Sequence, residues 1–66
     1  MKAKSILDPL TVQIAAVAYE DACERLPEPA GVEVKQLLAR RILGTASLGE
    51  RDPVLMRDDA LSYVAE

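Results

Sequence analysis

The sequence contains no histidine, no tryptophan and no phenylalanine, and it has a single cysteine, Cys23. Without a second cysteine the chain cannot form an internal disulfide. A lone cysteine without histidine offers no set of ligands for a structural zinc site. A nucleophilic thiol would also lack an imidazole base to activate it. These absences predict that the protein is not an enzyme and that it binds neither a metal nor another cofactor.

The chain has 66 residues, which is enough for one domain at most. A folded chain of about 60 residues buries only ~60% of the surface that its unfolded form exposes. Such chains usually need disulfides, a metal ion or oligomerisation for stability. Since the composition excludes the first two, we expect a homodimer.

Long uncharged apolar runs are also missing. The apolar N-terminal stretch is broken at Asp8-Pro9 and again at Thr11 and Gln13, so we expect no membrane span and no signal peptide. A cytoplasmic location follows from that expectation. The net charge of −3 resides in the first half of the chain and the second half is balanced, so nucleic acid is not the expected partner.

The residues that are abundant favour helices. Half of the chain is apolar, mostly alanine, leucine and valine. Asp8-Pro9 and Asp52-Pro53 are typical helix starts, because aspartate accepts backbone N–H bonds and proline suits the first helical position. Prolines follow the first helix, and Gly49 is placed to end the second in the left-handed conformation. We predict one all-α, three-helix domain over residues 1–66, with helices at about 9–26, 31–47 and 53–64.

The first predicted helix has more apolar surface than one core needs. Residues 14–19 are six apolar residues in a row, which encircle a helix of 3.6 residues per turn. At 100° per residue, the core face consists of Val12, Ala15, Ala16, Tyr19, Ala22, Cys23 and Leu26. A second stripe, Leu10, Ile14 and Val17, lies on the polar side. We interpret it as a subunit or partner interface; the alternative is that Ile6, Leu7 or the third helix covers it.

Arginines gather near the junction of the second and third predicted helices. Arg40, Arg41, Arg51 and Arg57 could contact an anion, and a helix-turn-helix would use the third helix to read DNA. Against this, Asp58 and Asp59 stand beside Arg57 and would repel phosphates. We therefore expect solvated or paired arginines, with Arg41 at the edge of the core.

Three further features have structural interpretations. The acidic residues Glu20, Asp21 and Glu24 are expected to be solvated, with Asp21 paired to Arg25 one turn away. Cys23 is expected to be a buried thiol. Tyr19 and Tyr63 fall on the core sides of their helices.

The second half of the chain carries a recognisable pattern. It consists of Arg41-Ile42-Leu43, then Gly49-Glu50-Arg51-Asp52-Pro53, then Met56-Arg57-Asp58-Asp59-Ala60-Leu61. With Tyr19-Glu20-Asp21-Ala22-Cys23, it resembles a group of small uncharacterised bacterial all-helical proteins. The resemblance implies a small helical fold and no particular activity, because the function of the group is unknown. The chain departs from the group at Ser47-Leu48 and at Leu55, where basic residues are common, which weakens the idea of a basic binding surface.

Together these observations predict a non-enzymatic protein–protein interaction or regulatory module. It would act through a self-associating helical surface centred on Leu10, Ile14 and Val17, or bind an unidentified protein partner. The alternative is a DNA-associated regulator that uses Arg40, Arg41, Arg51 and Arg57.

Overall fold

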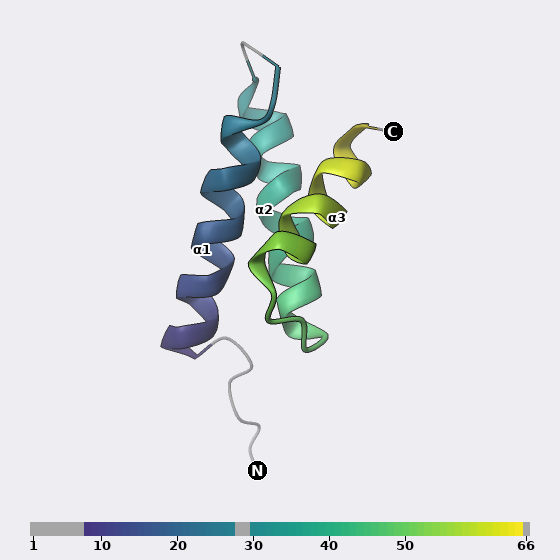
Figure 1. Cartoon of the computed structure of the whole chain (residues 1–66). Coiled ribbons are helices and arrows are strands. Elements are labelled where there is room, and N and C mark those ends of the chain that lie inside the picture. Colours follow the sequence, from purple (N-terminus) through teal and green to yellow (C-terminus); the bar gives the residue numbers. More distant parts are fainter. Residues whose placement is uncertain (1–7, 28–29, 66) are drawn as a thin grey trace.

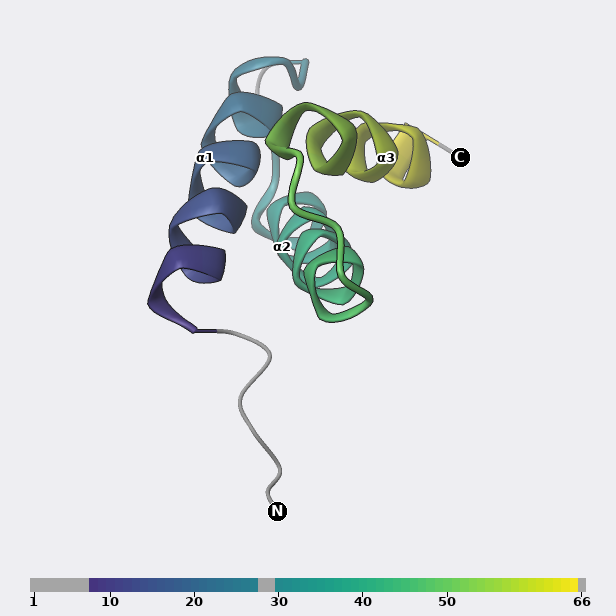
Figure 2. The same cartoon turned by 60° about the horizontal axis from the view of Figure 1, so that its bottom comes forward.

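The computed structural model describes residues 8–27 and 30–65, which form three α-helices: α1 (Pro9–Glu24), α2 (Val32–Ser47) and α3 (Pro53–Ala65). The predicted all-α, three-helix class is confirmed. Helices α1 and α2 run in opposite directions, and α3 lies obliquely against both of them (Figure 1). Seen from below, α3 begins beside α1 and continues over α2 (Figure 2).

Both predicted Asp-Pro starts are helix starts. The amide of Thr11 donates a hydrogen bond to Asp8 Oδ1 at 2.8 Å, and Pro9 is the first residue of α1. The amide of Val54 donates to Asp52 Oδ1 at 2.9 Å, immediately after Pro53 opens α3. Each carboxylate satisfies an amide that has no partner within its helix.

Helix α1 ends two residues before the expected position. The amides of Arg25 and Leu26 bond the carbonyls three residues earlier, at 3.0 and 3.2 Å, so the last turn tightens. Pro27 explains this early end, because a proline disfavours the helical conformation of the residue before it.

Helix α2 ends at Ser47, two residues before Gly49, the glycine predicted to terminate it. Gly49 has a φ of +108°, which a residue with a Cβ rarely adopts. The amide of Gly49 donates to the carbonyl of Ala46 at 3.0 Å, and that of Glu50 to the carbonyl of Thr45 at 3.1 Å. This pair of bonds is a Schellman motif, which satisfies carbonyls at the end of a helix.

The core is built mainly from small side chains. Among the described residues, the buried apolar side chains of more than alanine size are Leu38, Ile42 and Met56. The remaining buried apolar residues are Ala15, Ala18, Ala22, Ala46 and Ala60. Alanine faces let helices approach closely, but each contributes little apolar area. The folded chain therefore has a thin hydrophobic core.

The predicted core face of α1 is partly wrong. Val12 is 46% exposed and Ala16 is exposed, whereas Thr11 and Ala18 are buried. The buried face follows the small side chains at positions 11, 15, 18 and 22, because α2 and α3 both pack against this one helix and larger side chains would hold them apart. Tyr63 is another exception, since its side chain lies at the surface of α3 and is 46% exposed.

Candidate interaction surfaces

Large apolar side chains are more numerous on the surface than in the core. Single exposed apolar residues are normal, so their grouping is what matters. Two groups stand out, one on the first half of α1 and one on the outer face of α2 and α3. The exposed set within the described residues is Leu10, Val12, Val17, Val32, Leu37, Leu43, Leu48, Val54, Leu55 and Tyr63.

The predicted stripe on α1 is only partly solvent-exposed. Leu10 is 65% exposed and Val17 is 57% exposed, so α3 does not cover these two side chains. Ile14 lies between them, is half-buried and packs against the core. Ile6 and Leu7, which could cover the stripe, lie outside the described residues. The stripe therefore consists of two exposed ends and a middle residue that also serves the core.

The outer face of α2 and α3 contains two adjoining hollows. The first, of about 590 Å³, lies between the end of α2 and the start of α3. The second, of about 350 Å³, lies along α2. Both are lined by Thr45 and Leu48, and the Leu48 side chain is 89% exposed. We call this surface the α2–α3 face. Its other exposed apolar members are Leu37, Leu55 and Tyr63.

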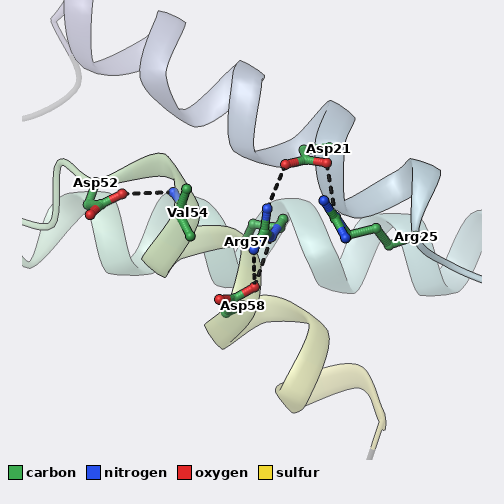
Figure 3. A network of polar contacts seen from close by, with 6 residues as sticks. All are labelled: Asp21, Arg25, Asp52, Val54, Arg57 and Asp58. Atoms are coloured by element: carbon green, nitrogen blue, oxygen red, sulfur yellow. Dashed lines mark hydrogen bonds and ion pairs between the residues drawn. The ribbon is translucent and has the colours of Figure 1, made fainter.

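Arg57 belongs to a polar network that joins α1 to α3 (Figure 3). Its guanidinium donates to Asp21 Oδ2 at 2.9 Å and pairs with Asp58 at 2.7 Å. Asp21 also accepts from Arg25 at 3.0 Å, which confirms the predicted pair within α1. The hydrogen bond from Arg57, followed by that from Arg25, holds the pKa of Asp21 below its usual value.

Arg41 joins α2 to α3 on the opposite flank. It donates to Asp59 through Nε at 2.7 Å and Nη2 at 3.3 Å, and its guanidinium carbon lies 4.7 Å from the centre of the Tyr63 ring. The hydrogen bond from Arg41 lowers the pKa of Asp59. Arg41 is therefore a paired arginine, as expected, but its side chain is exposed, as is that of Tyr63.

The segment Gly49-Glu50-Arg51-Asp52-Pro53 holds its own turn. Glu50 Oε2 accepts hydrogen bonds from the amides of Arg51 and Asp52, both at 3.0 Å. Arg51 Nη1 donates to the carbonyls of Ala46 and Glu50, both at 2.8 Å. Each polar residue of this segment therefore has a structural role, and the pattern does not by itself indicate a binding site.

The four arginines do not form one basic surface. Arg41, Arg51 and Arg57 bond to three different parts of the molecule, and an arginine bonded to a carboxylate would have to exchange that partner for a phosphate. The sequence alone does not indicate these ion pairs, because Asp21 is far from Arg57 along the chain and Asp59 is far from Arg41. The DNA-associated alternative stays a prediction with little geometric support.

The remaining candidate groups show no arrangement for chemistry. Glu20 and Glu24 are exposed, and no cluster of three or more metal-ligating side chains occurs within residues 8–27 and 30–65. Cys23 is half-buried beside Tyr19, and a hydrogen bond between their side chains raises the pKa of Tyr19. Cys23 thus packs against the core, as a structural thiol does.

Comparisons with known proteins give no functional assignment: no family model, no curated protein and no solved structure matches the chain. The helices in the described part of the chain are all too short or too polar to cross a membrane. Function must therefore be argued from the exposed apolar surfaces.

Proposed function

We propose that this protein is a non-enzymatic interaction module that associates with itself, and that the first half of α1 forms its homodimer interface. The observation that carries the proposal is the distribution of large apolar side chains, which lie mostly outside a core in which alanine is the commonest residue. On α1, Leu10 and Val17 form the exposed part of the interface, and Ile14 supports them from below.

The energy available from this surface sets the expected affinity. Fully burying a leucine or valine side chain contributes ~1.5–3 kcal/mol, and these two are already partly buried. Four such side chains in a symmetric dimer would contribute on the order of 4–8 kcal/mol. Association itself costs an estimated ~4–15 kcal/mol in lost translational and rotational freedom. A weak dimer that dissociates on dilution is therefore expected from this surface alone.

Sedimentation equilibrium over a range of protein concentrations tests the proposal. The wild type should show a concentration-dependent mass above that of a single chain. Leu10→Asp and Val17→Asp should each lower the average mass, because a buried unpaired carboxylate disfavours the interface. Both positions are exposed in the single chain, so circular dichroism should show unchanged helix content.

A matched control is Val32→Asp, which places the same charge at another exposed valine, at the start of α2. Its mass should equal that of the wild type. Ile14→Asp is a poorer probe, because the half-buried Ile14 also packs against the core and its loss would destabilise the monomer. Unchanged mass in both Leu10→Asp and Val17→Asp would refute the α1 interface.

A further inference from the structure

We propose that the α2–α3 face is a second self-association surface, on which another copy of the chain docks through a two-fold rotation. This inference is independent of the α1 interface, because it rests on other residues and on a different part of the molecule. Three observations carry it: the shape of the face, the order of its charges and the position of Gly44.

The α2–α3 face carries a projecting side chain beside two open hollows. Leu48 projects with 89% of its side chain exposed, and it stands between the two hollows of about 590 and 350 Å³. A two-fold contact joins the same surface patch on both copies, and a projection beside a recess is one way for a patch to fit itself. Rotation of one copy onto another can therefore place each Leu48 in the other copy's larger hollow, against the exposed Leu55.

The charges are ordered along the same face. Among the described residues, the larger hollow is lined by Glu50, Asp58 and Asp59 and by no cation, whereas the smaller one is lined by Arg40 and Arg41 and by no carboxylate. Arg41 and Asp59 bond each other across the boundary, and Asp58 also pairs with Arg57. Arg40 therefore marks the basic end, and Glu50 and Asp58 mark the acidic end. A two-fold axis that lies in the contact plane, at right angles to this order of charges, places opposite ends together.

Gly44 gives the third observation. It lies inside α2, where glycine costs about 1 kcal/mol relative to alanine. Among the described residues, no neighbour outside its own helix backbone requires it, since a Cβ built there meets none of their atoms within 4 Å. Gly44 lines the smaller hollow beside Leu48, where the absence of a side chain lets the backbone of another molecule approach closely. A partner on this face would account for a residue that weakens its own helix.

The two proposed surfaces together predict assembly beyond the dimer, which closes as a tetramer if the two axes cross at right angles, and either surface alone would give dimers. Sedimentation equilibrium on the full chain, Leu48→Asp, Val17→Asp and the double variant separates these cases. We expect the mass of Leu48→Asp to fall towards half that of the wild type, and its association constant to weaken by at least about tenfold. Leu48→Ala should weaken association less, and Val32→Asp should leave it unchanged.

Each outcome decides between the two surfaces. Dissociation by Leu48→Asp with no effect of Val17→Asp supports the α2–α3 face and refutes the α1 interface. The reverse result overturns the present inference and leaves the α1 interface standing. A wild type that is monomeric at every concentration overturns both. Circular dichroism of Leu48→Asp should show unchanged helix content, because Leu48 follows α2 and its side chain is 89% exposed.

A charge exchange gives a second, independent test. Arg40→Glu should weaken association about tenfold or more at low salt, because it places like charges at facing ends. Combining it with Asp58→Lys in the same chain should restore part of the association, since the new lysine of one copy then faces the new glutamate of the other. Failure of the double variant to associate better than Arg40→Glu would contradict the two-fold arrangement.

Discussion

Arg57 of α3 lies against Asp21 of α1, with 2.9 Å between Nη1 and Oδ2. Two residues further along α3, Asp59 accepts a hydrogen bond at 2.7 Å from Arg41 of α2. Residues two apart on a helix point to nearly opposite sides. The third helix is therefore held by one ion pair on each flank, and a thin alanine core between them is supplemented by polar contacts.

The two ion pairs should differ in strength. The Arg57 side chain is 15% exposed, whereas both partners of the Arg41–Asp59 pair are more than a third exposed. Exposed pairs contribute ~0–1 kcal/mol to the free energy of unfolding. A double-mutant cycle with Asp21→Asn and Arg57→Gln, followed by urea denaturation, should give a coupling energy of about 1 kcal/mol. The corresponding cycle for Arg41 and Asp59 should give a smaller one, and the opposite order would contradict this ranking.

The same carboxylates predict a loss of stability in acid. Folding lowers the pKa of Asp21 and Asp59 below their ordinary value of 3.8, through hydrogen bonds from Arg57 and Arg41 respectively. Their contribution is therefore fully present above pH 3.8 and is lost as the pH falls through the folded-state pKa values. Urea denaturation between pH 2 and 6 should show the free energy of unfolding falling below about pH 4. Asp21→Asn combined with Asp59→Asn should flatten that fall.

Local signals explain why the helix boundaries could be predicted. Asp8, Asp52 and Gly49 act within a few residues of their own position, so a sequence contains the whole interaction. The hydrogen bonds of Glu50 and Arg51 are equally local. The sequence of the segment does not by itself show which backbone groups these two side chains contact.

The contacts between helices could not be predicted in the same way. Asp21 and Arg57 are 36 positions apart, and only the packing of α3 brings them together. The side of α1 that faces the core is also predicted wrongly, for a related reason. The helical wheel takes the most hydrophobic side of a helix as its core side, and this places Val12 inside. Close packing of two helices against α1 instead buries small residues, including Thr11.

The rotation of α1 can be tested with two neighbouring alanines. Ala18 is fully buried, so Ala18→Leu should overpack the core and lower the free energy of unfolding by about 1–3 kcal/mol. Ala16 is exposed, so Ala16→Leu should change it by less than about 0.5 kcal/mol. Chemical denaturation of both variants at matched concentration makes the comparison. Equal losses would show that Ala16 faces the core, as the wheel suggests.

Alanine substitutions at Gly49 and at Gly44 should change the free energy of unfolding in opposite directions. Gly49→Ala forces a Cβ into the left-handed region and should lower the free energy of unfolding by about 1–2 kcal/mol. Gly44→Ala should raise it by about 1 kcal/mol under conditions where the protein is monomeric, because α2 gains helix propensity and the site is open. Sedimentation equilibrium on Gly44→Ala measures its association separately from the stability of its monomer. If another copy approaches Gly44 closely, the more stable monomer should also be the one that associates less tightly. An alanine that stabilises the monomer without weakening association would show that the backbone of α2 is not approached there.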